Sequence, residues 1–189
     1  MDIMNTSFHE GRLPLSWKEA DIVPVPKQRP IQDVNKHLRP IPLTPMLSKT
    51  AEDYVVYDFM MSTVLKKLDK KQYGTIPKSC STRALVSMIH NWHVRSDGNA
   101  FAIRVVDFRK VFDVIDHNIL ANKLSDYDIS NHILNWITEF LLDRRQRVRL
   151  AQDCFSKWRY IPDGVPQRTK LGPWLFLIMT DYLNAGRQI

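Results

Sequence analysis

The pattern of hydrophobic and polar residues divides the chain into a proline-rich beginning and a longer part with helical periodicity. Seven of the 11 prolines lie between Pro14 and Pro45. Because proline lacks an N–H group and fixes φ, this stretch is expected to form extended segments and turns. Within it, residues 20–25 (ADIVPV) are predicted to form a short strand, and Pro24 favours a position at the edge of a sheet.

Two helices are predicted to follow, because apolar residues recur there at intervals of three or four. The first has Thr44 as its N-cap and Pro45 at its first helical position. Its predicted inward-facing residues are Leu47, Ala51, Tyr54, Val55, Phe59 and Val64. The second begins at Ser81 or Thr82 and ends at the Asp-Gly turn of residues 97–98. Its apolar stripe consists of Leu85, Met88, Ile89 and Trp92.

The second half of the chain mixes strands and helices. Residues 101–108 (FAIRVVDF) are short and rich in β-branched side chains, which predicts a buried strand that ends on an aspartate. The chain is therefore predicted to be mixed α/β. The other expected elements are helices over residues 118–127, after Ser130 and from Pro173 to about Asn184, a hairpin of residues 147–152 with 154–161, and a loop over residues 163–173. The helix after Ser130 should bury Ile133, Leu134, Ile137, Phe140 and Leu141.

Composition and charge narrow the class of protein. With 44% hydrophobic and 25% charged residues, the chain has enough apolar side chains for a packed core. Lys and Arg number 27 against 20 Asp and Glu, a net charge of +7, which favours polyanionic partners. The longest apolar run, residues 174–179, is far shorter than the roughly 20 residues of a membrane span. The N-terminus shows no signal pattern.

The two cysteines, Cys80 and Cys154, indicate a reducing compartment. They show neither CxxC spacing nor the histidine pairing of zinc sites, and two cysteines cannot staple a chain of this size. We therefore expect an intracellular protein without a disulfide or a structural metal. The sequence does not decide between nucleus and cytoplasm, and it leaves the oligomeric state open.

Residues 105–117 (VVDFRKVFDVIDH) hold the candidate metal ligands. An aspartate at the end of a buried strand lies at the sheet margin, where its carboxylate faces solvent. Carboxylate oxygens of this kind suit Mg²⁺, so Asp107 is the candidate ligand, with Asp113 and Asp116 as alternatives in the following turn or helix. The competing interpretation is structural, with Asp107 in a strand-end turn and the other two aspartates as helix caps.

Residues 164–176 (GVPQRTKLGPWLF) form a loop shaped by glycine and proline, with a helix beginning at its end. The free N–H groups and the positive dipole of a helix N-terminus suit phosphate. Gln167, Arg168 and Lys170 add hydrogen-bond donors. An ordinary loop is the competing interpretation.

Four arginines, Arg144, Arg145, Arg147 and Arg149, lie within the segment RRQRVR. Because side chains alternate along a strand, Arg145, Arg147 and Arg149 are expected on one face. Such a face can follow a phosphate backbone, so all four arginines are candidates for nucleic-acid binding. The competing interpretation is a solvated hairpin edge.

Taken in order, these segments resemble the reverse transcriptase of non-LTR (LINE-type) retrotransposons. Residues 105–117 are similar to polymerase motif A and residues 164–176 to motif B. Three earlier blocks also match: residues 11–27 (GRLPLSWKEADIVPVPK), 37–53 (HLRPIPLTPMLSKTAED) and 72–85 (QYGTIPKSCSTRAL). The resemblance extends from about Phe8 to Leu183, and five blocks in one order are far more specific than any single block.

The resemblance implies the fingers and part of the palm of a right-hand polymerase. Residues 1–99 correspond to a fingers-like region, and residues 100–189 to a partial palm that contains motifs A and B. The implied activity is RNA-directed DNA synthesis, with an RNA template, a DNA primer, a dNTP and two Mg²⁺ ions.

Residue by residue, the resemblance assigns roles to six positions. Asp107 binds both Mg²⁺ ions, and the backbone carbonyl of Phe108 is a second contact. Phe112 crowds the 2′ position of the sugar, and Gln167 lies near the incoming nucleotide. The implied contacts with the triphosphate are Lys27 and Arg39.

The chain also departs from the family pattern. Motif C, an aromatic-x-Asp-Asp hairpin that supplies further metal-binding carboxylates, is absent from the 189 residues. We therefore expect a fold truncated before motif C and no polymerase activity from this chain alone, because one carboxylate cannot hold two ions. Arg168 replaces the glycine that usually follows the motif B glutamine, Lys78 replaces a common glycine, and Val111 replaces a common alanine. Two other interpretations are a non-catalytic basic fragment that binds nucleic acid and a decayed transposon remnant that folds poorly.

Overall fold

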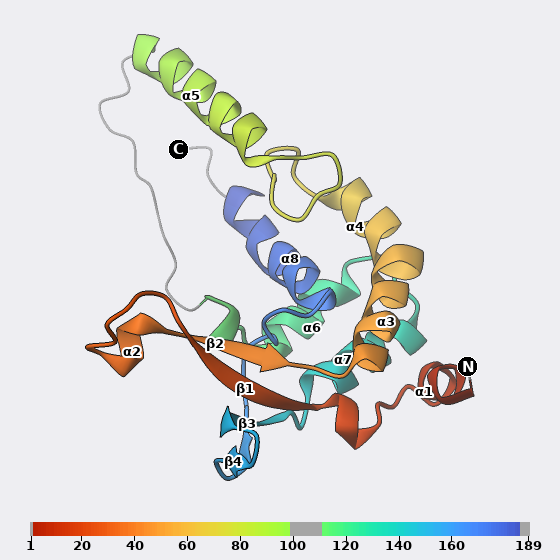
Figure 1. The fold of residues 1–189 in the computed structure, drawn as a ribbon. Coiled ribbons are helices and arrows are strands. Elements are labelled where there is room, and N and C mark those ends of the chain that lie inside the picture. Colours follow the sequence, from red (N-terminus) through yellow and green to blue (C-terminus); the bar gives the residue numbers. More distant parts are fainter. Residues whose placement is uncertain (1, 99–110, 186–189) are drawn as a thin grey trace.

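The computed structural model describes residues 2–98 and 111–185. Within these ranges the chain is mixed α/β, as the sequence predicts, with a sheet on one side of a group of helices (Figure 1). The strands are β1 (Glu19–Pro26), β2 (Leu38–Leu43), β3 (Arg145–Ala151), β4 (Cys154–Phe155) and β5 (Arg159–Tyr160). The α-helices are α1 (Asp2–Glu10), α2 (Val34–His37), α3 (Met46–Tyr54), α4 (Met61–Lys67), α5 (Ser81–Asp97), α6 (His117–Ser125), α7 (Asn131–Leu141) and α8 (Leu171–Ala185). The predicted strand over residues 101–108 lies outside the described ranges.

Strand β1 lies between β2 and β3 rather than at a sheet edge. It pairs with β2 in antiparallel orientation, and its first half, Glu19–Ile22, pairs in parallel with β3. Pro24 faces Pro40 across the β1–β2 pair, beyond the part of β1 that β3 covers. The predicted edge position is therefore wrong for the strand as a whole. Pro24 itself still lies where β1 has a single neighbour, because a missing N–H is tolerated there.

The predicted hairpin after α7 is confirmed. β3 pairs in antiparallel orientation with β5 near its beginning and with β4 near its end. The returning strand is broken into two short pieces, and a register shift between Arg149 and Ala151 accompanies the break. The hairpin therefore extends the sheet on the side of β3 that faces away from β1.

A long helical segment runs from α3 through a π-helical turn, η2 (Val55–Met60), into α4. Its buried residues are Ser48, Ala51, Glu52, Val55, Val56, Met60 and Val64. The predictions that Leu47 and Tyr54 face inward are wrong, since these side chains are 51% and 45% exposed. Ser48 and Glu52 take the core-facing positions of α3 instead, and the wider π turn buries two consecutive valines.

The predicted cap at the start of this helical segment is also absent. Helix α3 begins at Met46, after Pro45. The hydroxyl of Thr44 is buried and has no hydrogen-bond partner among the residues that the structure describes.

The core lies between the α3–α4 segment and the helices α6, α7 and α8. Trp136 and Phe140 of α7 and Leu175 of α8 are completely buried. Trp136 Nε1 also donates a hydrogen bond to Ser7 Oγ at 3.0 Å, which ties α1 to α7. The inward-facing residues predicted for α7 are confirmed, with Leu134 only partly buried.

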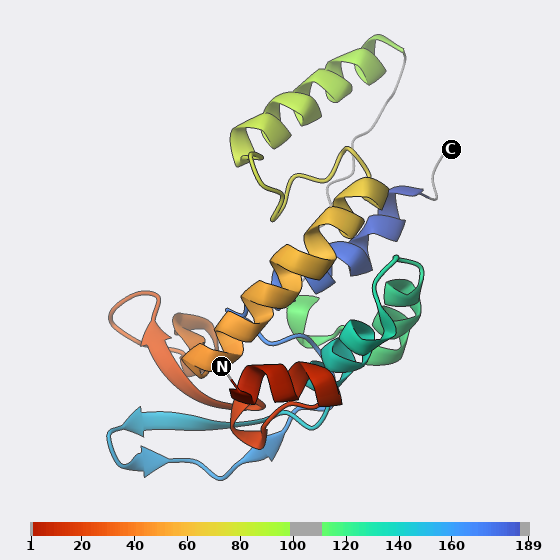
Figure 2. The same cartoon turned by 90° about the vertical axis from the view of Figure 1, so that its right-hand side faces the viewer.

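Helix α5 projects from the rest of the molecule (Figures 1 and 2). Its predicted range is confirmed, but none of its residues is fully buried. The apolar stripe is therefore largely exposed, and Leu85 is 50% exposed. Among the described residues, no helix combines the length and apolar character that crossing a bilayer requires.

Trp136→Ala is expected to lower the free energy of unfolding by about 3–5 kcal/mol, because the variant lacks an enclosed indole and its bond to Ser7. Leu85→Ala, on the exposed face of α5, is expected to change it by less than about 0.5 kcal/mol. Urea unfolding followed by circular dichroism measures both values. A destabilisation at Leu85 as large as that at Trp136 would contradict the exposed position of α5.

Candidate functional site

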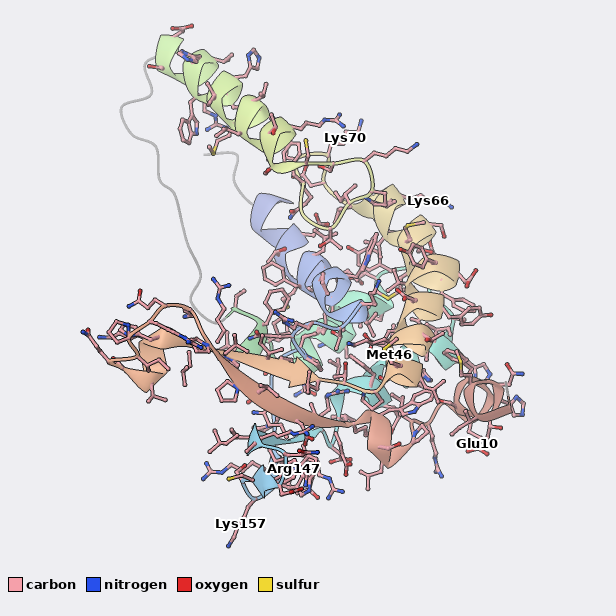
Figure 3. The ribbon with its side chains drawn as sticks, in the orientation of Figure 1. Glu10, Met46, Lys66, Lys70, Arg147 and Lys157 are labelled. Atoms are coloured by element: carbon pink, nitrogen blue, oxygen red, sulfur yellow. The ribbon has the colours of Figure 1, made fainter. Side chains whose placement is uncertain are left out.

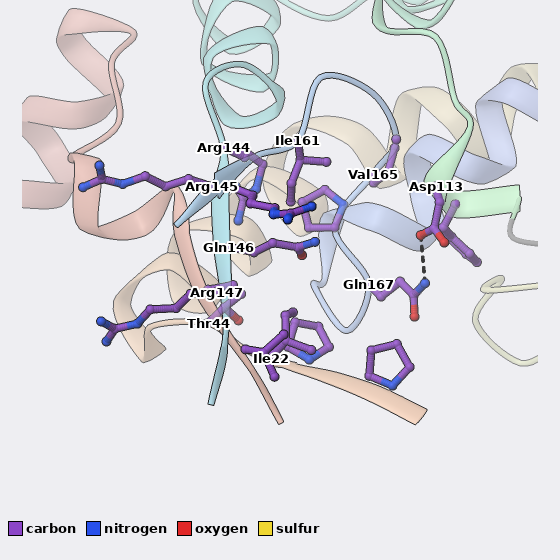
Figure 4. Close-up of a pocket in the computed structure, with 18 of the residues that line it drawn as sticks. Ile22, Thr44, Asp113, Arg144, Arg145, Gln146, Arg147, Ile161, Val165 and Gln167 are labelled. Atoms are coloured by element: carbon purple, nitrogen blue, oxygen red, sulfur yellow. Dashed lines mark hydrogen bonds between the residues drawn. The ribbon is translucent and has the colours of Figure 1, made fainter. Parts of the chain in front are cut away.

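A cavity of about 700 Å³ lies between the sheet and the loop that precedes α8 (Figure 4). Phe112, Asp113 and residues 163–167 form one side of it. The cavity therefore lies where the ends of the motif A and motif B segments face β1, β2 and β3. The sheet side is formed by Ala20, Ile22, Pro40, Pro42, Gln146 and Val148.

Gly164 brings the motif A and motif B segments into direct contact. It has a φ of +87°, and a Cβ atom there would lie 2.6 Å from the carbonyl oxygen of Phe112. The Gly164 N–H donates to the Ile115 carbonyl at 2.9 Å, and the Val165 N–H donates to the Phe112 carbonyl at 2.6 Å. Only glycine suits both the left-handed backbone and this close approach.

Two of the predicted nucleotide contacts, Phe112 and Gln167, line the cavity. The ring of Phe112 packs against Phe176 of α8, with 4.8 Å between the ring centroids. Gln167 Nε2 donates to Asp113 Oδ1 at 3.0 Å (Figure 4). The carboxylate of Asp113 thus orients the Gln167 amide beside Phe112.

The metal site predicted at Asp107 and Phe108 lies outside the described residues. Within residues 2–98 and 111–185, no group of three or more His, Cys, Asp or Glu side chains could hold a metal ion. The alternative ligands have other partners. Asp113 binds Gln167, and Asp116 caps α6 by accepting two backbone N–H groups at 2.7 and 3.1 Å. The interpretation of Asp116 as a helix cap is therefore confirmed.

The structure does not bring Lys27 and Arg39 to the cavity. Both residues are exposed, and neither lines it. Arg39 lies opposite Val25 in the β1–β2 register, so alternation places its side chain on the opposite sheet face from Pro40. The predicted triphosphate contacts and Gln167 therefore do not converge on one site in this conformation.

The first turn of α8 is not a free phosphate site, contrary to the prediction from the sequence. The Glu52 carboxylate, on α3, accepts the N–H groups of Lys170 at 2.7 Å and Leu171 at 3.3 Å. Thr169 Oγ1 accepts the N–H of Gly172 at 3.1 Å, and the next residue is a proline. The N–H groups that a helix start normally leaves free are therefore already bonded within the chain.

Glu52 does not stand out in the sequence, because apolar periodicity gives weight only to apolar residues. The sequence offers one signal. Ser48 and Glu52 lie three residues before Ala51 and Val55, respectively, so they fit the same helix face as well as Leu47 does. Burial raises the pKa of Glu52 above its ordinary value of 4.5. The hydrogen bonds from the α8 backbone and Ser48 act in the opposite direction.

Arg144 is a core residue rather than a surface residue. It is 4% exposed, its guanidinium donates to the Phe140 carbonyl at 2.9 Å, and it lies over the Phe140 ring. Burial lowers its pKa to about 10, and the charge of Glu52 opposes that shift. The prediction that all four arginines lie on a surface open to nucleic acid is therefore wrong for Arg144. Its buried guanidinium instead binds a carbonyl group in the last turn of α7.

The remaining three arginines, the arginine row Arg145, Arg147 and Arg149, lie on one face of β3 as predicted. Arg145 and Arg147 line the cavity, but their side chains extend away from Gln167 and Val165 (Figure 4). Arg145 forms an ion pair with Glu19, and Arg147 Nε lies 2.7 Å from Asp21 Oδ1. No acidic residue in the part of the chain that the structure describes forms an ion pair with Arg149.

Aromatic side chains from the returning strand interleave with the arginine row. The guanidinium of Arg147 lies 3.9 Å from the ring centroid of Phe155 and 4.5 Å from that of Trp158. Arg145 lies over Trp158 and Arg149 over Phe155, at 5.2 and 5.7 Å. Because cation–π contacts and ion pairs hold these side chains, the row is more ordered than free surface arginines.

Two basic residues, at positions where the resemblance implies a glycine, adopt the backbone conformation that glycine favours. Lys78 has a φ of +62° and Arg168 a φ of +61°. The left-handed region costs a residue with a Cβ atom roughly 1–2 kcal/mol. Both residues therefore occupy a backbone conformation that favours glycine.

Comparisons with known proteins point to the same family. Residues 25–186 match the family described as "Reverse transcriptase (RNA-dependent DNA polymerase)". The chain is 23% identical over 181 residues to the Pol polyprotein of the type-1 retrotransposable element R2 of Popillia japonica. It is 27% identical over 182 residues to the RNA-directed DNA polymerase of the mobile element jockey of Drosophila funebris. It is 26% identical over 182 residues to the probable RNA-directed DNA polymerase of transposon BS of Drosophila melanogaster.

These matches cover 94% of the chain but 25%, 19% and 20% of the respective relatives. The chain therefore spans about a quarter or less of the length of the curated relatives it matches. The resemblance to non-LTR retrotransposon reverse transcriptases is confirmed.

Glu52→Gln is expected to remove a pH dependence from the stability of the chain. Because the folded-state pKa of Glu52 is raised, the folded chain keeps this proton at pH values where the unfolded chain has released it. The stabilisation from this group is fully present below pH 4.5 and is lost as the pH rises through the folded pKa. The wild type should therefore lose stability relative to Glu52→Gln as the pH increases, which urea unfolding at a series of pH values measures.

Glu52→Ala is the control for the hydrogen bonds. It leaves two backbone N–H groups of α8 without an acceptor, and it should be less stable than the Gln variant by about 2–4 kcal/mol. A difference between wild type and Glu52→Gln that stays constant with pH would contradict the raised pKa.

Arg168→Gly is expected to raise the free energy of unfolding by about 0.5–1 kcal/mol, because glycine adopts a positive φ without a Cβ clash. Arg168→Ala removes the same charge and side chain but keeps the Cβ atom, so it should give no such gain. Thermal unfolding of the three proteins measures the difference. Equal stabilities of the Gly and Ala variants would show that backbone strain at this position is negligible.

Proposed function

The chain belongs to the reverse transcriptase (RNA-dependent DNA polymerase) family, and we propose that it forms part of a non-LTR retrotransposon polymerase. Its proposed substrates are an RNA template, a DNA primer and dNTPs. The observation that carries the proposal is the contact of Gly164 with the Phe112 carbonyl. This contact joins the segments of motifs A and B beside one cavity that Gln167 also lines.

In this proposal the cavity receives the incoming dNTP. Its volume of about 700 Å³ falls within the range of roughly 300–1,000 Å³ that is usual for small-molecule sites. Phe112, held by Phe176, crowds the 2′ position of the sugar, and Gln167, oriented by Asp113, contacts the nucleotide. Lys27 and Arg39 contact the triphosphate only after the β1–β2 pair moves, since neither lines the cavity.

The proposal extends to the architecture and the location of the protein. Residues 1–99 form the fingers-like region of a right-hand polymerase, and residues 100–189 form part of its palm. Motif A spans residues 105–117 and motif B residues 164–176. The docking of Gly164 against the motif A segment supports the placement of both motifs in one unit. An intracellular location is part of the same proposal.

The proposed ligands for Mg²⁺ are the Asp107 carboxylate and the Phe108 carbonyl. Reverse transcriptases generally use divalent metal ions, which activate the primer 3′-hydroxyl and stabilise the leaving pyrophosphate. The described residues alone do not fit a two-ion site, because Asp113 and Asp116 are engaged elsewhere. We therefore propose that the ions require motif C carboxylates and that the 189 residues alone do not extend a primer.

A second candidate function is nucleic-acid binding without catalysis. The observation that favours it is the arginine row, in which ion pairs and cation–π contacts order three arginines on one face of β3 without a metal ion. Arg149 is the residue of the row that is available to a phosphate, since Arg145 and Arg147 already form ion pairs with Glu19 and Asp21.

A chimera distinguishes the two candidates. Residues 25–186 of this chain replace the matching segment of the jockey RNA-directed DNA polymerase, and primer extension on an RNA template is measured with Mg²⁺ and dNTPs. We expect incorporation that Asp107→Ala abolishes, while the 189-residue chain alone gives no more product than its own Asp107→Ala variant.

The matched control is Asp153→Ala in the same chimera, because Asp153 is an exposed carboxylate in the turn between β3 and β4. A folded chimera without incorporation would contradict the polymerase proposal and leave binding as the function. Incorporation by the isolated chain above its Asp107→Ala variant would contradict the proposed dependence on motif C.

A further inference from the structure

A basic segment that none of the sites above includes connects α4 to α5. Residues 66–83 hold six basic side chains and one acidic side chain, Asp69, which amounts to +5 of the net charge of +7 for the whole chain. The basic residues are Lys66, Lys67, Lys70, Lys71, Lys78 and Arg83. So strong a local excess of one sign favours a polyanionic ligand.

The basic segment is a folded surface and not a loose loop. The N–H of Gln72 donates to the Asp69 carbonyl at 3.0 Å, and the N–H of Ser79 donates to the Ile76 carbonyl at 3.2 Å, which forms two turns. The Asp69 N–H donates to Asp181 Oδ1 of α8 at 3.0 Å. The bond between Asp69 and Asp181 joins the beginning of the segment to the C-terminal half of α8.

One lysine of the segment binds another part of the chain, whereas the other basic side chains are exposed to solvent. Lys67 Nζ donates to the Asp126 carbonyl at 2.6 Å and lies 3.4 Å from Asp128 Oδ2. Lys66 and Lys70 extend outward from the end of α4, far from Arg147 and the arginine row (Figure 3). The acidic residues within the described ranges form no ion pair with the exposed basic residues, which are Lys66, Lys70, Lys71, Lys78 and Arg83.

The position of the segment relates it to the cavity. Leu171 and Asp181 of α8 are ten residues apart in the sequence, which corresponds to about 15 Å along the helix axis. A nucleic-acid strand advances about 3.4 Å per nucleotide. A strand with one end near the cavity therefore reaches the basic segment after about four nucleotides.

We propose that residues 66–83 bind the phosphate backbone of a nucleic-acid strand at some distance from the cavity. The inference rests on the proposed function for the identity of the polyanion. The exposed lysines neutralise phosphates without reading bases, so the binding is independent of sequence and weakens with salt.

The test is binding of fluorescently labelled 16-nucleotide strands, oligo(U) RNA and oligo(dT) DNA, measured by anisotropy over a series of salt concentrations. In Lys66→Gln/Lys70→Gln, the slope of log Kd against log salt should fall by about 1.4, or about 0.7 for each phosphate that the variant no longer neutralises. The matched control is Arg12→Gln/Lys49→Gln, which removes the same charge elsewhere and should leave most of the slope. Matching thermal transitions confirm that both variants are folded.

A reduced slope for RNA, for DNA or for both supports the proposal and identifies the strand that is bound. Equal slopes for the variant and its control overturn it. The same variants are also tested with vesicles that contain phosphatidylserine. A decrease in binding that is seen only with these vesicles overturns the proposal as well, because it would assign the segment to an anionic membrane. An inactive chimera together with a reduced slope would contradict the polymerase proposal but support the binding surface. An active chimera with an unchanged slope would contradict only the binding surface.

Discussion

A buried carboxylate, Glu52, links the first half of the chain to the start of α8. Glu52 lies on the long helical segment of the first half, and it accepts two N–H groups from the start of α8, 118 and 119 residues further on. A charge without solvent is costly unless its hydrogen bonds are satisfied, and here the α8 backbone and Ser48 supply them. The loop with Gly164 and Gln167 leads directly into that first turn. The bonds of Glu52 therefore anchor the end of the loop that meets the motif A segment.

The sheet separates two chemistries on its two faces. On one face, prolines and apolar residues of β1 and β2 border the cavity, whose lining also includes charged residues such as Asp113, Lys157 and Arg159. On the other face, arginines alternate with acidic and aromatic side chains. Because side chains alternate along a strand, the side chains of Gln146 and Arg147 project from opposite faces of the sheet although the two residues are adjacent in the sequence.

Much of the fold follows from the sequence because most elements carry their own local signal. Periodicity and turn residues alone predict the helices α5, α7 and α8 and the hairpin after α7. Two of the failures, at Arg144 and Leu47, involve contacts between residues that are not neighbours in the periodic pattern. Buried Arg144 donates to the Phe140 carbonyl at the end of α7, and Glu52, rather than Leu47, faces the core and accepts hydrogen bonds from α8. For the site, the motifs identify Phe112 and Gln167, but only the folded chain shows that Asp113 orients the glutamine.

The facing prolines of β1 and β2 also bear on how the chain avoids association with itself. Since neither Pro24 nor Pro40 can donate, they form a pair without hydrogen bonds, and the register places Pro42 in the same class of position. In such positions the backbone nitrogen points away from the partner strand, so Pro40 and Pro42 remove two donors from the outer edge of β2. A strand from another molecule would find few N–H groups there to continue the sheet. The proline-rich stretch thus protects an exposed sheet edge against aggregation.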